Sequence, residues 1–167
     1  MKVVEIKKHG GPEVLYIGSR PVPKPKKNEV LVKVKAAGLN RPDILQREGD
    51  YPPPKDASDI LGLEVSGEVV ELGEKTKNIK IGDKVCALVS GGGYSEYCLA
   101  PYSQCLPIPK NISFEEASTI PETFFTIWFN LFVRSRIEKN KKILIHGGSS
   151  GIGTTAIQFA KNFGLEV

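Results

Sequence analysis

The chain has 167 residues, 40% of them hydrophobic, which suffices for one domain or two small ones with a real core. Its net charge of +4 comes from scattered lysines, and the short basic clusters at 24–27 and 139–142 contain no aromatic residues, so a nucleic-acid-binding surface is disfavoured. The three cysteines, Cys86, Cys98 and Cys105, form no CxxC pair and fit a reduced, cytoplasmic protein. The N-terminus has no signal-type apolar run, and no segment is long enough to span a bilayer, so a membrane partner is not expected.

The first part of the chain is predicted to be rich in β-strands. Seventeen glycines and twelve prolines indicate many turns. Within 29–37, Val30, Val32 and Val34 alternate with Lys33 and Lys35, which is typical of a half-buried strand. Five to seven short strands at this spacing indicate a barrel or sandwich. Strands are expected at 1–7, 14–18, 29–37, 61–72, 85–89, 94–99 and 105–108, with one or two helical turns after Pro42.

The pattern changes from β to α near residues 110–122. Ser113 with Glu116 three residues later predicts a capping box and a short helix. A longer apolar helix is predicted to start at Pro121, with Trp128 and the phenylalanines around it at helical spacing as core residues. We therefore place a boundary between a β-domain and a second domain in this region.

A glycine-rich turn follows a short apolar segment near the end of the chain. Residues 142–146 are predicted to form a short buried strand, and 154–162 a helix. A strand, a glycine-rich turn and a helix N-terminus in this order hold a dinucleotide pyrophosphate through free backbone N–H groups, although a purely structural turn also needs glycines. The glycines fit the G-x-x-x-G-x-G pattern of short-chain dehydrogenases, whereas Gly147, Ser150 and Gly153 fit some medium-chain reductases. The mostly β structure that precedes the loop favours the second pattern.

Several further motifs carry a specific family resemblance. They are the segments 37–43 (AGLNRPD), 46–52 (QREGDYP), 61–67 (LGLEVSG), 91–97 (GGGYSEY) and 120–123 (IPET) with Thr126, besides the glycine loop. In this order they resemble medium-chain dehydrogenase/reductase proteins, in particular the zinc-free quinone oxidoreductase branch and its p53-inducible subgroup. The resemblance implies a β-rich GroES-like barrel domain at 1–120 for substrate, followed at 121–167 by the first β-α unit of a Rossmann NADP-binding domain. It also implies that the sequence is an N-terminal fragment, inactive by itself.

No zinc site is expected. Catalytic zinc needs three ligands drawn from Cys, His and carboxylates. In zinc-dependent relatives a Cys lies near the stretch occupied here by Asn40 to Asp43, and a His precedes the glutamate that matches Glu64, where this chain has Leu63. Three widely spaced cysteines cannot supply a structural quartet, and His9 and His146 are interpreted as surface or packing residues.

The resemblance also assigns site residues. It implies that Tyr51, Asn40 and Asp43 are catalytic, with Tyr51 as the hydrogen-bond donor to a substrate oxygen. Alternatively, Tyr51 packs on the neighbouring prolines, and Asn40 caps a helix ahead of Pro42. A pair of Glu64 and Glu68 is conceivable, but a solvated sheet face is favoured for both. For the cofactor the resemblance implies Asn40, Thr126, Gly147, Gly148, Ser149, Ser150, Gly151, Ile152 and Gly153.

The implied activity is hydride transfer from NADPH to a quinone or a similar conjugated acceptor, by a homodimer of the full-length protein. One alternative is reduction of an enal or enoyl thioester by the same architecture. An alternative of another class is a non-catalytic GroES-like interaction module. The residue that would distinguish NADP from NAD lies about 20 residues beyond the glycine loop, past Val167, so NADPH rests on the resemblance.

Overall fold

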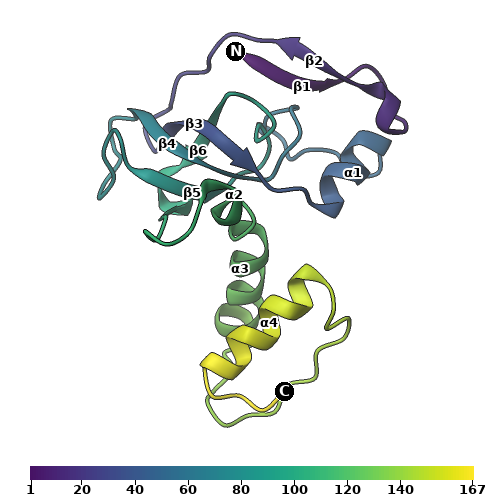
Figure 1. Cartoon of the computed structure of the whole chain (residues 1–167), viewed down its shortest axis with the longest axis vertical. Helices are drawn as coiled ribbons and strands as arrows, with labels where there is room; N and C mark the ends of the chain where they lie inside the picture. Colours follow the sequence, from purple (N-terminus) through teal and green to yellow (C-terminus); the bar gives the residue numbers. More distant parts are fainter. The chain divides into compact units, whose positions relative to one another are not determined.

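A computed structural model describes all residues from 1 to 167. Contacts divide the chain into two compact units, Met1–Pro121 and Glu122–Val167. The strands lie in the first unit, whereas helices and irregular segments make up the second (Figure 1). No helix is long and apolar enough to cross a membrane.

The first unit contains two antiparallel sheets. Strands β1 (Lys2–Ile6) and β2 (Leu15–Ser19) form a hairpin in which Lys2 pairs with Ser19 and Ile6 with Leu15. The larger sheet has the order β6-β3-β4-β5-β7, so its neighbours are not all consecutive in sequence. Its strands are β3 (Glu29–Ala37), β4 (Glu64–Leu72), β5 (Lys84–Leu88), β6 (Tyr97–Pro101) and β7 (Cys105–Pro107). The predicted β-rich first part is confirmed, although several strands are shorter than expected.

Small and β-branched side chains form the core of this unit. The predicted alternation in β3 is visible, with Val30 and Val32 fully buried and Lys33 exposed, but Leu31 is buried as well. Both faces of the first half of β3 are therefore covered. The central cluster consists of Val30, Val32, Val65, Val69, Val85, Ala87, Val89, Cys98 and Ala100.

Two short helices accompany the sheet. Helix α1 (Arg41–Glu48) has Asn40 as its N-cap, as predicted, and ends at Gly49, whose φ of +98° is the left-handed conformation that suits glycine. Helix α2 (Phe114–Ala117) begins with the predicted capping box. The N–H of Glu116 donates to Oγ of Ser113 at 3.2 Å, and the N–H of Ser113 donates to Oε2 of Glu116 at 2.8 Å.

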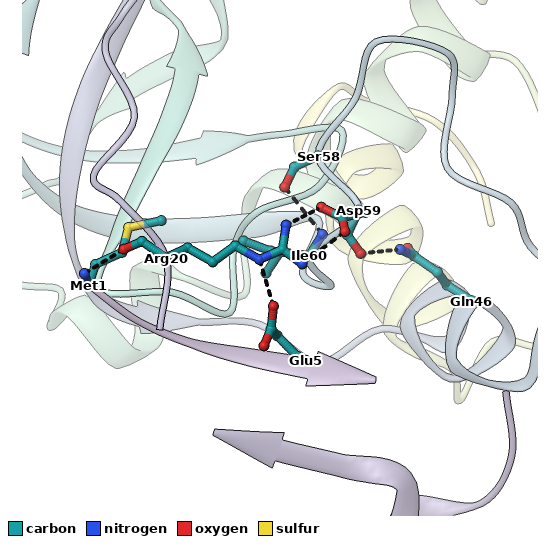
Figure 2. A network of polar contacts seen from close by, with 7 residues as sticks. All are labelled: Met1, Glu5, Arg20, Gln46, Ser58, Asp59 and Ile60. Atoms are coloured by element: carbon teal, nitrogen blue, oxygen red, sulfur yellow. Dashed lines mark hydrogen bonds and ion pairs between the residues drawn. The ribbon is translucent and has the colours of Figure 1, made fainter. Parts of the chain in front are cut away.

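Arg20 ties the hairpin to the segment that follows α1 (Figure 2). Its guanidinium donates to Oε1 of Glu5 in β1 at 2.6 Å and binds both carboxylate oxygens of Asp59, at 2.8 and 3.0 Å. Gln46 of α1 donates to the backbone oxygen of Asp59 at 3.2 Å. The Arg20 guanidinium lowers the pKa of both carboxyl groups below their usual values, mainly through these hydrogen bonds.

The second unit is built from α3 (Pro121–Trp128), a π-helical segment (Phe129–Arg134) and α4 (Gly151–Asn162). Six close ring pairs join the aromatic side chains of these elements, among them Phe124 with Phe159 at 4.9 Å and Trp128 with Phe132 at 4.7 Å between ring centroids. The rings gather as predicted, but Trp128 is 46% exposed. The prediction that it is a core residue is therefore wrong, since its other face has no covering layer within this unit.

The predicted buried strand at 142–146 is also wrong. This segment makes a single parallel bridge, between Lys142 and Glu166, and Leu144 is 81% exposed. A parallel strand needs neighbours on its sides and helices on its faces, and Glu166 is the only backbone partner here. The helix that follows begins at Gly151, three residues earlier than predicted, because Ser150 caps it.

The Arg20 contacts predict a pH-dependent contribution to stability. Arg20→Gln removes the partner that lowers the two carboxyl pKa values, so the variant should unfold at a lower temperature than the wild type at pH 7. A lowered folded-state pKa stabilises the fold above the ordinary carboxyl value of about 4 and ceases to do so as the pH falls through the folded value. Thermal unfolding from pH 7 to pH 2 should show the gap between the two proteins closing at low pH.

Lys24→Gln is the matched control. It removes one positive charge from the segment that joins β2 to β3, which also contains Arg20, and the Lys24 side chain is exposed without an ion pair. Its unfolding temperature should stay near that of the wild type at every pH. A gap for Arg20→Gln that persists unchanged at pH 2 would instead assign Arg20 a packing role.

Candidate functional site

The N-terminus of α1 brings two of the predicted site residues together. Asn40 has an extended backbone as the N-cap, and Pro42 fixes the first turn of the helix. The N–H of Asn40 donates to Oδ2 of Asp43 at 2.8 Å, and Asp43 is 4% exposed. The predicted residues Asn40 and Asp43 therefore form one rigid corner between β3 and α1.

Asp43 is the acceptor for three separate segments. Besides the N–H of Asn40, it receives the hydroxyl of Tyr94 at Oδ2, at 2.8 Å, and the N–H of Gly62 at Oδ1, at 3.2 Å. All three contacts use the carboxylate as an acceptor only, which suits its ionised form. Burial, followed by the hydrogen bond to Asp43, raises the pKa of Tyr94 far above its usual value, so its hydroxyl remains a donor at neutral pH.

Glu64 occupies a buried position beside Asn40. It is 2% exposed, and Nδ2 of Asn40 donates to its Oε1 at 2.8 Å. The prediction of a solvated sheet face is therefore wrong for Glu64. Alternation assigned it to the open face of β4, but Glu64, Val65 and Ser66 are all buried because both faces are covered at the start of this strand.

Two glycine contacts allow this network to close. A Cβ on Gly38 would lie 2.1 Å from Oε1 of Glu64, so only glycine leaves room for the carboxylate. Gly62 has φ +100°, and a Cβ there would lie 2.7 Å from Cα of Gly93 and from Cδ1 of Tyr94. The backbones of Gly62 and Gly93 pack directly on each other, with the N–H of Gly93 donating to the oxygen of Gly62 at 3.0 Å. This approach puts the Tyr94 ring over the loop that leads to Glu64.

Tyr51 is placed differently. It lies in the loop after α1 and is 40% exposed, and its side chain makes no hydrogen bond within the first unit. It is not part of the Asn40–Asp43 corner. Its exposure leaves part of the side chain accessible to solvent, which is what a donor to a substrate oxygen requires.

The glycine loop caps α4 in the second unit. Oγ of Ser150 accepts from the N–H of Gly153 at 3.0 Å and donates to the oxygen of Gly147 at 2.8 Å. A Cβ on Gly153 would lie 2.3 Å from the Gly147 oxygen, so the loop folds tightly onto the first helical turn. The N–H groups of Gly151 and Ile152 keep no partner in the chain, as is usual for the first turn of a helix.

The other residues predicted for the cofactor belong to the same unit. Gly148 and Ser149 lie within the loop, and Thr126 is half-buried in α3, where its backbone oxygen accepts from Asn130. A turn with unpaired N–H groups and little side-chain bulk fits a phosphate group. These residues are therefore compatible with a dinucleotide, and a Cβ on Gly148 would meet only Ile157, at 3.5 Å.

The thiols and histidines do not gather into a metal site. The chain contains no group of three or more His, Cys, Asp or Glu residues arranged to hold a metal ion. Burial raises the pKa of Cys86 to about 11 and those of Cys98 and Cys105 to about 12, so all three are neutral thiols at pH 7.

Comparison with known proteins identifies the family. Residues 26–110 match the model of the alcohol dehydrogenase GroES-like domain. Over its whole length the chain is 35% identical to the quinone oxidoreductase of Sus scrofa, of which it covers 51%. The chain thus spans about half the length of the curated relatives it matches.

Two solved structures are similar in fold. The quinone oxidoreductase of Escherichia coli complexed with NADPH has a TM-score of 0.82 and 34% identity, covering 99% of this chain and 51% of that one. The CurK enoyl reductase has a TM-score of 0.87 and 29% identity, covering 98% of this chain and 52% of that one. Both likenesses extend across the two units of the sequence.

The backbone contact at Gly62 predicts a large effect of a single methyl group. Gly62→Ala combines a left-handed φ with backbone overlap at 2.7 Å, so we expect a loss of about 2–5 kcal/mol in the free energy of unfolding. Gly82→Ala is the matched control, because Gly82 has φ +89° but open space around its Cβ, and should cost only about 1 kcal/mol. Urea unfolding of both variants measures the difference. Equal losses would mean that the Gly62–Gly93 approach relaxes freely.

Proposed function

Because the chain belongs to the family of the alcohol dehydrogenase GroES-like domain, we propose that the full-length protein is an NADPH-dependent oxidoreductase that passes a hydride to a quinone or a similar conjugated acceptor. The observation that carries the proposal is the similarity to quinone oxidoreductases along the entire chain. In this proposal, residues 1–120 form the substrate domain, and 121–167 begin a Rossmann domain for the cofactor.

NADPH, when bound, would supply the hydride, so the chain's own residues have to bind, orient and donate hydrogen bonds. We assign the pyrophosphate to the loop 147–153, whose unpaired N–H groups at Gly151 and Ile152 suit a phosphate. Thr126, in the same unit, is assigned to the cofactor as well. The choice of NADPH over NADH is supported by the Escherichia coli protein, which was solved with NADPH.

We assign acceptor polarisation to a hydrogen-bond donor rather than to zinc. Asn40 is engaged with the Glu64 carboxyl group, Leu63 is buried at the position of the expected histidine, and the cysteines belong to no group of three residues that could hold a metal ion. Tyr51 is 40% exposed and carries a hydroxyl that can donate to a developing oxyanion. Asp43 would act through Asn40, since its carboxylate is fully occupied by three donors.

Two other functions remain as candidates for the test. The CurK likeness favours reduction of an enoyl thioester by the same architecture. A non-catalytic GroES-like interaction module would bind no NADPH, so saturable NADPH binding by the full-length protein separates it from both reductases. We place the protein in the cytoplasm, where its three free cysteines would stay reduced, and propose a homodimer.

Tyr51→Phe tests the donor. The substitution keeps the ring and removes only the hydroxyl, and loss of one oxyanion donor commonly costs 10²–10³ in rate, as an order of magnitude. A partly wet site should lose less, so we expect kcat with a quinone to fall by roughly ten-fold, with little change in NADPH affinity. Ser150→Val should instead weaken NADPH binding, because it removes the cap that shapes the loop. Unchanged kcat for Tyr51→Phe with every acceptor, together with lower stability, would return Tyr51 to a packing role.

The zinc-free assignment has its own test. Purified full-length protein should contain no stoichiometric metal by elemental analysis and should keep its NADPH oxidation rate after prolonged exposure to a strong chelator. One zinc per subunit, removed by the chelator together with the activity, would contradict the assignment.

A further inference from the structure

A buried neighbour, Glu64, holds one end of the Asn40 side-chain amide, beside the capping box that this residue forms with Asp43. Glu64 is 2% exposed, and Oε1 of its carboxylate accepts from Nδ2 of Asn40 at 2.8 Å. If the amide turned its oxygen toward Glu64, this hydrogen bond would be lost. The NH₂ group of the Asn40 amide therefore faces Glu64, and its carbonyl oxygen is directed away from Glu64.

The backbone of Asn40 is held by a second chain of contacts. The Tyr94 hydroxyl donates to Oδ2 of Asp43 at 2.8 Å, and the same oxygen accepts from the N–H of Asn40 at 2.8 Å. Tyr94 is itself fixed, because its N–H donates to the oxygen of Leu61 at 2.9 Å and its ring lies against Gly62. Removal of the Tyr94 hydroxyl leaves Asp43 with two of its three donors, the N–H groups of Asn40 and Gly62, and so weakens the hold on the start of α1.

We propose that Glu64 and Tyr94 are positioning residues for Asn40. Glu64 holds the side-chain amide, and Tyr94 holds the backbone through Asp43, so that the amide presents one fixed hydrogen-bonding pattern to a bound nicotinamide or acceptor. The proposal rests on the proposed function of Asn40 but extends it to two residues outside the predicted site. It also gives a role to the segments 61–67 and 91–97, which contain no other residue of that site.

A double-mutant cycle in the full-length protein tests the coupling. Tyr94→Phe and Glu64→Gln should each lower kcat for NADPH-dependent quinone reduction by roughly ten-fold, as misplacement of a site residue does. In an Asn40→Ala background the same substitutions should change kcat by less than about two-fold, because the residue that they orient is gone. Equal effects in both backgrounds would overturn the proposal.

Matched controls lie close by: Glu68 shares β4 with Glu64, and Tyr97 begins β6 three residues after Tyr94. Tyr97→Phe removes a hydroxyl from β6 that makes no hydrogen bond, and Glu68→Gln neutralises a carboxylate on β4 that is half-exposed. Both should keep kcat within about two-fold of the wild type, the limit for independent sites. A loss as large as that of Tyr94→Phe or Glu64→Gln would mean that any change on these strands disturbs the site, and would count against specific positioning.

A spectroscopic readout is independent of activity. The side-chain NH₂ signals of Asn40, assigned by their loss in Asn40→Ala, should include one proton shifted downfield by its hydrogen bond to Glu64. This shift should shrink in Glu64→Gln, because a neutral amide oxygen is a weaker acceptor than a carboxylate. Tyr94→Phe should broaden or move the backbone N–H signal of Asn40. Unchanged Asn40 signals in both variants would overturn the proposal even if the protein reduces quinones. The expected signals in a protein that reduces no quinone would refute the proposed function alone and leave the positioning of Asn40 supported.

Discussion

The carboxylate of Asp43 is the point on which the organisation of the first unit depends. It accepts hydrogen bonds from Asn40, Gly62 and Tyr94, three residues that belong to segments separated by some twenty to thirty positions each. A buried carboxylate is costly unless its oxygens are satisfied, so the three segments must arrive together for the group to be tolerated. The requirement fixes the end of β3, the start of α1 and the loop before β4 relative to one another.

Glycine makes this convergence possible. Gly62 and Gly93 meet backbone to backbone, and Gly38 leaves space for the Glu64 carboxylate. In each case the Cβ of any other residue would overlap an atom of the network. The glycines in these motifs therefore serve close approach as much as turn geometry, and they explain why the motifs contain glycine next to acidic and aromatic residues.

The sequence predicted the elements of the first unit well, because alternation and turn residues are local signals. The resemblance named Asn40 and Asp43 as site residues without predicting their contact, and Pro42 indicated the cap of α1 as an alternative role of Asn40. It did not predict the burial of Glu64, since alternation along β4 says which face a residue occupies but not whether a neighbouring segment covers that face. The all-buried run around Leu61 and Leu63, rich in apolar residues and glycine, is the signal that could have indicated it.

In the second unit the prediction from local patterns was wrong in the opposite direction, since a segment that was expected to be buried is exposed. The apolar run 142–146 has the composition of a buried strand, but burial of a parallel strand comes from neighbours that lie elsewhere in the chain. Helix α4 still forms, because its cap at Ser150 and its close packing at Gly153 are encoded within a few residues. The phosphate-type turn is thus a local structure that does not depend on the strand before it. Its N–H groups at Gly151 and Ile152 are already unpaired and oriented by the helix. The loop would therefore have its conformation before a phosphate binds to it.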